Sequence, residues 1–229
     1  LTQATQLRIY LIKNKEGYTL LKSSHHCISD GWSSPILLRQ VYRHYEALAK
    51  HQEVVINKDM SYLAAQDYIA SHMDEARAHW QMNISHVNDL SVLLDKKVRI
   101  DDVRHLTRAQ VQHTQIKGAD YQKLIASARA LGVTLNTLTQ YAWHKLIHTY
   151  TQDTQTIVGT TISGRSLPIA GIEESVGLYI NTLPLVMDWQ DETIGEQLQE
   201  LHRRIESLND YGFMNLAELQ SQGHRLFHS

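Results

Sequence analysis

The stretch HHCISDGWS, residues 25–33, decides how the first part of this chain folds, because it separates a strand pattern from a helix pattern. Residues 18–26 predict the returning strand of a β-hairpin. The Asp-Gly pair inside the stretch breaks that strand, since this pair is typical of turns. Pro35 then suits the first position of a helix, with Ser33 or Ser34 as the capping residue.

Strand and helix patterns alternate along the chain on both sides of this stretch. Residues 7–11 alternate between apolar and polar side chains and predict the first strand of the hairpin. The further predicted helices begin and end near residues 62–82, 121–131, 135–150 and 194–208, and the further predicted strands near 111–116, 156–162 and 178–187. Such alternation predicts an α/β fold. The polar stretch 85–108 is the expected linker between two lobes.

The composition is that of an ordinary soluble globular protein with a core. Hydrophobic residues make up 42% of 229 residues, and 22 Lys and Arg residues are spread along a chain of net charge −2, which argues against a nucleic-acid partner. Cys27 is the only cysteine, so a reducing compartment is expected. No apolar run approaches the roughly 20 residues of a membrane span, and the first residues lack a secretory signal. We therefore expect a cytoplasmic protein that binds neither membrane nor nucleic acid.

The two adjacent histidines raise the question of a metal site. Neighbouring side chains on a strand point to opposite faces, so His25 and His26 face apart if the strand continues to Cys27. They then cannot bind one ion, and we expect no metal. His26 fits proton transfer instead, because imidazole titrates near neutral pH, with Asp30 fixing the local geometry. A strand-end histidine beside an ordinary Asp-Gly turn is the alternative that this segment leaves open.

Several motifs resemble those of condensation domains of nonribosomal peptide synthetases. Residues 25–33 are similar to the HHxxxDGWS signature, whose HHxxxDG core is shared with the chloramphenicol-acetyltransferase-like superfamily. Residues 157–165, IVGTTISGR, resemble a VGxxxSGR loop, and residues 175–185, SVGLYINTLPL, resemble VGxFxNTLPLR. Residues 62–68 with Trp80 match the YxDYAxW region more loosely. The resemblance spans nearly the whole chain, with its two sharpest motifs about 150 positions apart.

The resemblance implies an α/β, chloramphenicol-acetyltransferase-like fold with two lobes in a V, incomplete at both ends. Residues 1–95 would form the C-terminal part of the N-lobe, which carries HHxxxDG, and residues 96–229 most of the C-lobe. The implied reaction is peptide-bond formation between a donor acyl or peptidyl thioester and an acceptor aminoacyl thioester. Upstream and downstream peptidyl carrier proteins would deliver both substrates on 4'-phosphopantetheine arms, beside an adenylation domain of the same synthetase. No tightly bound cofactor or metal is expected.

Roles for individual residues follow from the resemblance and from the chemistry. His26 would accept the proton of the attacking amine or stabilise the developing charge. The backbone N–H of Gly31 would donate to the tetrahedral oxyanion. Asp30 belongs to the catalytic motif but is expected to hold the loop more than to touch substrate. The substrate-binding candidates are His25, Trp32, Ser33, Arg165 and Asn181, with packing as the competing interpretation for His25 and Trp32 and loop anchoring for Arg165.

The resemblance also implies segments outside this chain. The Asp of the motif would pair with an Arg upstream of Leu1, so that Asp30 is expected to lack its usual partner, and closing strands would follow Ser229. Two alternative functions remain: a free-standing HHxxxDG acyltransferase, and a truncated, non-catalytic domain that docks carrier proteins. Epimerisation and heterocyclisation domains fit less well, because they would differ at 181–185 or replace the two histidines.

Overall fold

The computed structural model describes residues 5–85, 87 and 111–220 of the chain. The chain forms two compact units, each discontinuous in sequence. Unit 1 consists of Leu1–Glu75 and Ser163–Asn181, and unit 2 of Ala76–Ile162 and Thr182–Ser229. The predicted boundary between residues 95 and 96 lies outside the described residues and stays a prediction.

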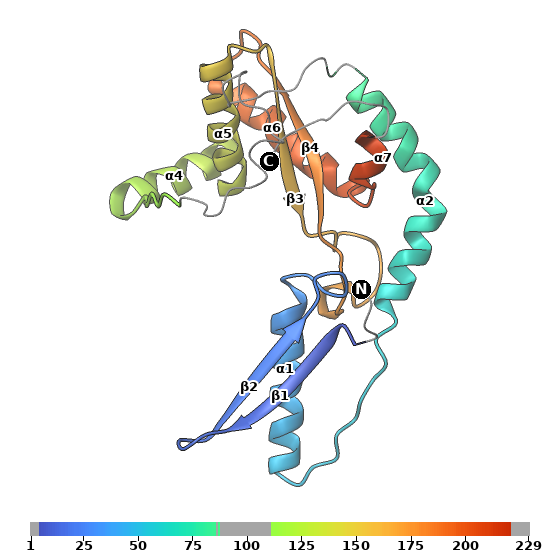
Figure 1. Cartoon of the computed structure of the whole chain (residues 1–229). Coiled ribbons are helices and arrows are strands. Elements are labelled where there is room, and N and C mark those ends of the chain that lie inside the picture. The colour runs from blue at the N-terminus through green and yellow to red at the C-terminus, as the bar shows by residue number, and fades with distance from the viewer. Residues whose placement is uncertain (1–4, 86, 88–110, 221–229) are drawn as a thin grey trace, which may run out of the picture. The chain divides into compact units, whose positions relative to one another are not determined.

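Unit 1 begins with the predicted β-hairpin. Strand β1 (Leu7–Lys13) pairs antiparallel with β2 (Tyr18–Ser24), and Leu11 lies opposite Leu20 (Figure 1). The turn between the strands is closed by the Asn14 N–H, which donates to the Gly17 carbonyl at 2.9 Å. Strand β2 ends two residues before the predicted position, so the two histidines lie beyond the strand.

Helix α1 (Ser33–Ala49) follows the HHCISDGWS stretch, as predicted, but its first turn differs from the expectation. The predicted cap is wrong, because Ser33 is already helical and Ser34 instead accepts a hydrogen bond from Lys22 Nζ at 3.0 Å. The Asp30 carboxylate takes the capping role and accepts the Ser33 N–H at 3.0 Å. The helix is amphipathic, but most of its apolar stripe is exposed, at Val41, Tyr45 and Leu48 among others.

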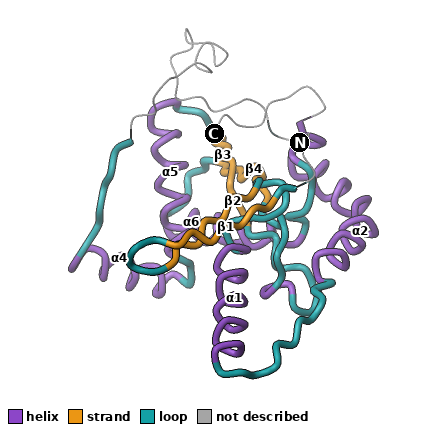
Figure 2. The backbone as a smooth tube through the Cα atoms, turned by 60° about the horizontal axis from the view of Figure 1, so that its bottom comes forward, coloured by secondary structure: helices purple, strands orange, loops and turns teal. Residues whose placement is uncertain are grey.

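A loop of residues 50–60, drawn in teal in Figure 2, leads from α1 to helix α2 (Ser61–Ile84). Helix α2 is predicted correctly, and its residues are shared between the two units. None of the helices in the described part of the chain combines the length and the apolar character of a membrane span.

Unit 2 contains most of the remaining regular structure. Its elements are α4 (Gly118–Leu131), α5 (Leu135–Thr151), β3 (Gln155–Ile162), β4 (Asn181–Asp188), α6 (Ile194–Asp210) and α7 (Leu216–Gln220). Strands β3 and β4 pair with each other, and α5 contacts both β3 and α6 (Figure 1). Leu183, Leu185 and Leu201 lie fully buried between these elements. The strand predicted at residues 111–116 does not form, and β4 begins three residues after the predicted start.

Two helix ends in unit 2 are explained by local chemistry. Thr134 caps α5, because its hydroxyl accepts the Thr137 N–H at 3.1 Å. Helix α6 begins with a capping box, in which Thr193 and Glu196 satisfy each other's backbone N–H groups. These caps fix where the helices begin, which the apolar periodicity alone leaves uncertain.

Candidate active site

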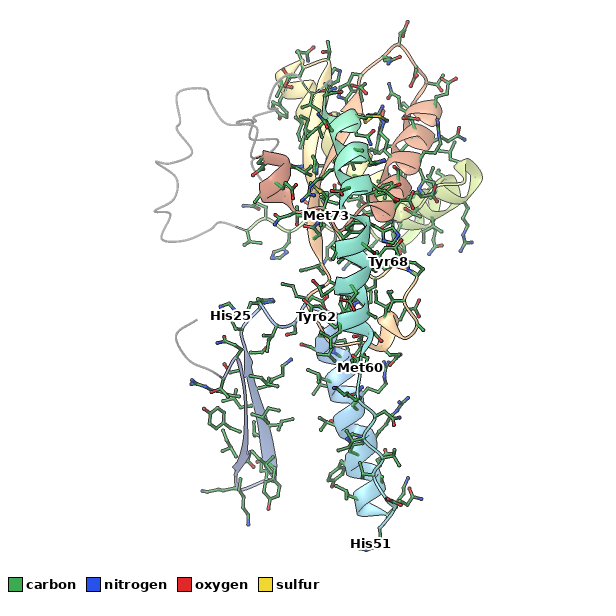
Figure 3. All side chains as sticks on the ribbon, turned by 90° about the vertical axis from the view of Figure 1, so that its right-hand side faces the viewer. His25, His51, Met60, Tyr62, Tyr68 and Met73 are labelled. Carbon is green, nitrogen blue, oxygen red and sulfur yellow. The ribbon has the colours of Figure 1, made fainter. Side chains whose placement is uncertain are left out.

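Residues 25–30 form a compact turn between β2 and α1. The His25 N–H donates to the Gln6 carbonyl at 2.9 Å, and the His25 carbonyl accepts the Ile28 N–H at 3.3 Å. His25 Nδ1 accepts the Cys27 N–H at 3.0 Å, so this ring stabilises the backbone of its own turn. Figure 3 shows His25 at the end of the hairpin. These contacts give His25 a structural role and leave its predicted contact with substrate untested.

The side chain of His26 is exposed on this turn. The strand does not continue to Cys27, since β2 ends at Ser24 and the chain turns immediately afterwards, so strand alternation does not set the directions of the two histidines. Within the described residues, no group of three or more His, Cys, Asp and Glu side chains is arranged to hold a metal ion. An accessible imidazole on a turn that is fixed by hydrogen bonds is suited to exchanging protons with a bound substrate.

The carboxylate of Asp30 is buried and surrounded by donors. Its Oδ1 accepts the Ser33 N–H at 3.0 Å and lies 2.9 Å from the Ser33 hydroxyl oxygen, and its Oδ2 accepts the Tyr179 N–H at 3.1 Å. Arg165 Nη2 lies 3.1 Å from Oδ1. Burial alone would raise the pKa of Asp30, but the bonds from Tyr179 and Ser33 and the charge of Arg165 together hold that pKa below its ordinary value. Asp30 is therefore an ionised anchor for the turn.

Arg165 anchors its own loop to this turn. Its Nη1 donates to the carbonyls of Ile172 at 2.7 Å and Ser175 at 2.8 Å, and its guanidinium lies 4.2 Å from the centre of the Tyr179 ring. The side chain is only 7% exposed. These contacts support the anchoring interpretation over substrate binding. The upstream arginine that the resemblance implies lies outside this chain, but Asp30 still has a counter-charge within it, because Arg165 pairs with its carboxylate.

Ser33 joins two motifs that lie far apart in the sequence. Its hydroxyl accepts the Gly177 N–H at 3.1 Å and lies 2.9 Å from both the Gly177 carbonyl and Asp30 Oδ1, to either of which it can donate its single proton. The Asp30 N–H also donates to the Gly177 carbonyl, at 3.2 Å. Ser33 is fully buried, so its contacts are internal and offer no surface to a substrate.

The exposed side of the turn carries Gly31 and Trp32. Nothing lies within 4 Å of the position that a Gly31 Cβ would occupy. Among the described residues the Gly31 N–H has no hydrogen-bond acceptor, which leaves it available to a ligand. Trp32 is 59% exposed, which does not fit the packing interpretation. Asn181, the last predicted site residue, is the half-buried first residue of β4.

Comparison with known proteins places this arrangement in a family. The family model described as "Condensation domain" matches residues 1–227. The chain belongs to the condensation-domain family. The predicted recognition is thereby confirmed.

Two curated relatives of this condensation-domain chain are large synthases. The N-(5-amino-5-carboxypentanoyl)-L-cysteinyl-D-valine synthase of Amycolatopsis lactamdurans is 36% identical over 226 residues, which are 93% of this chain and 6% of that protein. Bacitracin synthase 3 of Bacillus licheniformis is 29% identical over 227 residues, 96% of this chain and 4% of that protein. The chain thus spans only a small part of the curated relatives it matches.

Solved structures confirm the predicted fold. VibH, described as an NRPS condensation enzyme, superposes with a TM-score of 0.70 at 20% identity, covering 97% of this chain and 52% of that one. The chloramphenicol-acetyltransferase-like α/β fold of condensation domains is therefore present here as about half of such a chain.

Four residues of this candidate site were missed by sequence reasoning. Gly177 and Tyr179 supply backbone groups to Ser33 and Asp30, and Ser175 bonds to Asp59 in the loop before α2. The glycine of SVGLYINTLPL was the available signal. A Cβ at Gly177 would lie 2.2 Å from the Tyr62 ring, so only glycine lets the backbone approach this closely. No sequence signal marked Asp59.

Proposed function

We propose that this chain belongs to a domain that forms a peptide bond between two thioester-bound substrates, with His26 as the residue that handles protons. One observation carries the proposal. The imidazole of His26 is exposed, whereas Asp30, four residues further along the same turn, is buried and bonded to Arg165. Such an arrangement keeps a reactive side chain accessible while the backbone beneath it stays fixed.

The reaction needs little activation beyond orientation. The amine of the acceptor aminoacyl thioester attacks the carbonyl carbon of the donor thioester, the new C–N bond forms, and the C–S bond breaks with the sulfur as leaving group. The attacking nitrogen loses one proton, and the departing thiolate gains one. His26 can accept the proton from nitrogen and donate it to sulfur, so one imidazole can serve both proton transfers. Holding the two reactants in place supplies several kcal/mol of the rate enhancement, on the order of that seen in well-oriented reactions.

The oxyanion of the tetrahedral intermediate needs a hydrogen-bond donor. The Gly31 N–H is a candidate, because it is unpaired within the described chain and no side chain shields it. Trp32 is exposed beside it and offers an apolar surface to a substrate. Asp30, Ser33 and Arg165 act indirectly, by fixing the backbone that carries these groups.

The substrates would arrive on 4'-phosphopantetheine arms of an upstream donor and a downstream acceptor carrier protein, with an adenylation domain in the same synthetase. This proposal rests on the family and on the synthases that the chain resembles. No resident cofactor or metal takes part in it. A cytoplasmic location suits the exposed free thiol of Cys27.

The test uses the complete condensation domain with two loaded carrier proteins and compares the native protein with His26→Ala. Dipeptide formation should fall by about a hundredfold to ten-thousandfold, the usual worth of a positioned acid–base group. His51→Ala replaces another exposed histidine of unit 1 and should leave the rate unchanged. If His26→Ala forms dipeptide at the native rate, the proposed role is wrong. If loaded carrier proteins bind but even the native domain forms no dipeptide, the docking alternative replaces it.

A further inference from the structure

Residues 175–179 form a strip that is hydrogen-bonded at one end to Asp59, an exposed residue, and at the other end to the buried Asp30. At one end, the Asp59 Oδ2 atom accepts the Ser175 hydroxyl at 2.7 Å and the Val176 N–H at 3.2 Å. At the other end, Asp30 Oδ2 accepts the Tyr179 N–H at 3.1 Å. The backbone of the strip is therefore fixed between two carboxylates from different loops of unit 1.

The hydrogen bonds around Asp59 favour its ionised form. Its Oδ1 accepts the Ser61 N–H at 2.9 Å, so both carboxylate oxygens are engaged. Burial alone would raise the pKa of Asp59, but the hydrogen bonds from Ser175, Ser61 and Val176 outweigh it and hold the pKa below its ordinary value. An ionised acceptor makes shorter and stronger hydrogen bonds than a neutral one.

The side chain of Tyr179 extends this network. Its hydroxyl donates to Ser175 Oγ at 2.7 Å, and the Ser175 hydroxyl donates to Asp59 Oδ2 at 2.7 Å. The three side chains thus form a chain of hydrogen bonds that ends at the Asp59 carboxylate. Ser175 is fully buried. The Tyr179 ring lies 5.2 Å from the Tyr62 ring, edge to face, which fixes the ring beside the strip. The VGxFxNTLPLR motif that residues 175–185 resemble has Phe where this chain has Tyr179, and Phe carries no hydroxyl.

The strip in turn holds the turn that carries His26. The Gly177 carbonyl accepts the Asp30 N–H at 3.2 Å, and the Gly177 N–H donates to Ser33 Oγ at 3.1 Å. Moving residues 175–176 would pull on Gly177, and Gly177 is bonded to both ends of the segment 30–33. A displacement at Asp59 is thus transmitted through the Ser175 hydroxyl and the Val176 N–H to the strip, and from the backbone of Gly177 to Asp30 and Ser33.

We infer that Asp59 is a positioning residue for the reaction at His26: through Ser175 and Val176 it fixes the strip 175–179, and the strip fixes the 25–33 turn. The catalytic part of this inference rests on the proposed function above. The structural part, that Asp59 sets the conformation of the turn, does not. Asp59 touches no reacting group, and it lies outside all the motifs that identify the family.

The experiment uses the complete condensation domain, with Cys27 carrying a trifluoromethyl label and any other cysteine replaced. Cys27 is exposed and follows His26 directly, so its fluorine resonance reports the conformation of the turn. Asp59→Asn keeps the shape but leaves an amide NH₂ facing a former donor. Ser175→Ala removes the link more gently. Glu53→Gln removes a charge from an exposed residue of the same loop and is the matched control.

We expect the fluorine resonance to shift or split in Asp59→Asn and Ser175→Ala and to remain native in Glu53→Gln. Dipeptide formation should fall about tenfold in kcat, since small misplacements in an active site cost one to two orders of magnitude, while KM for both loaded carrier proteins is unchanged. A native resonance in both folded variants overturns the inference, even if their melting temperatures fall. If His26→Ala has native activity, the proposed function fails, and the fluorine result still decides the role of Asp59.

Discussion

Arg165 and Asp30 form a buried ion pair, with Nη2 3.1 Å from Oδ1, although 135 positions separate them in the sequence. The pair joins the loop of the SGR motif to the turn of the HHxxxDG motif. Its side chains are 7% and 0% exposed, so water screens the two charges little. Two of the motifs that carry the family resemblance are thus joined by one buried ion pair within unit 1.

Arg165→Ala should therefore be strongly destabilising. It leaves the Asp30 carboxylate buried without its counter-charge, and breaking such a pair typically costs about 3–5 kcal/mol. Arg39→Ala removes another arginine of unit 1, whose partner Glu174 is exposed, and should cost less than about 1 kcal/mol. The free energy of unfolding from urea titrations of both variants measures the contrast. Equal costs would show that the buried pair contributes no more than a surface pair.

Local patterns predicted much of this fold from the sequence. The hairpin, the long helix α2 and the helices α5 and α6 were all recognised from apolar periodicity and turn residues, which act over a few positions. The partner of Asp30 could not be recognised in this way, because Arg165 reaches it through tertiary structure. The resemblance directed attention to an upstream arginine instead, and it gave no indication of Asp59.

The errors in the predicted strands have physical causes. A strand requires a partner for its backbone, and residues 111–116 have an apolar pattern but no partner strand among the described residues. The start of β4 was predicted at residue 178, within the segment whose Gly177 and Tyr179 N–H groups bond to Ser33 and Asp30. Those donors are committed to the site, so sheet pairing begins only at Asn181.

Two glycines near the site should respond differently to substitution by alanine. Gly164 has φ +66°, and a Cβ there would lie 1.9 Å from the Tyr179 carbonyl oxygen, so Gly164→Ala should cost several kcal/mol, on the order of the largest core substitutions. Gly31→Ala meets open space and should leave stability within about 0.5 kcal/mol of native. Thermal unfolding of both variants checks the difference.

Gly31→Ala also tests the oxyanion role. The added methyl group lies next to the N–H that would face the substrate, so we expect a loss of dipeptide formation of about tenfold or more in a stable protein. A native rate together with native stability would mean that no oxyanion approaches this N–H closely. His26→Ala, measured alongside, gives the scale for a full loss of the chemical step.

Arg204 holds β4 to α6, and we expect that lysine cannot replace it. Its guanidinium donates to the Val186 carbonyl at 2.9 Å, to Asp188 at 2.9 Å and to Glu200 at 2.8 Å. A lysine ammonium cannot reach three acceptors in this planar arrangement, so Arg204→Lys should cost about 1–3 kcal/mol. Arg203→Lys is the matched control, because the neighbouring side chain is 71% exposed and bonds only to Glu200 in the described structure. Similar unfolding free energies for the two variants would contradict this account.

His144 makes the stability of unit 2 depend on pH. The ring is fully buried, and its Nδ1 lies 2.8 Å from Thr156 Oγ1, which in turn accepts the Trp189 indole N–H at 3.0 Å. Thr156 thus bonds to both the Trp189 indole and Nδ1, while Nε2 of the buried ring has no hydrogen-bond partner among the described residues. Burial, helped by the charge of Arg204, lowers the pKa of His144 from 6.5 to about 4.

The sign of the effect follows from where the proton binds. Below pH 6.5 the unfolded chain binds a proton at His144, whereas the folded chain binds it only below about pH 4. The free energy of unfolding therefore falls as the pH drops between these two values. The difference corresponds to a loss of up to about 3 kcal/mol. The lowered pKa values of Asp30 and Asp59 act mainly below 3.8 and do not overlap this window.

His144→Gln keeps an amide that can hydrogen-bond to the Thr156 hydroxyl but cannot take up a proton, so its unfolding free energy should vary less with pH in this window than that of the native protein. The variant should be less stable at neutral pH, because the smaller amide fills the site less well. His51→Gln, at an exposed histidine of unit 1, controls for the loss of a histidine. Urea titrations at several pH values between the two pKa values measure all three proteins. If His144→Gln shows the full native pH dependence, the protons are bound elsewhere, and the buried imidazole is not the group that links folding to pH.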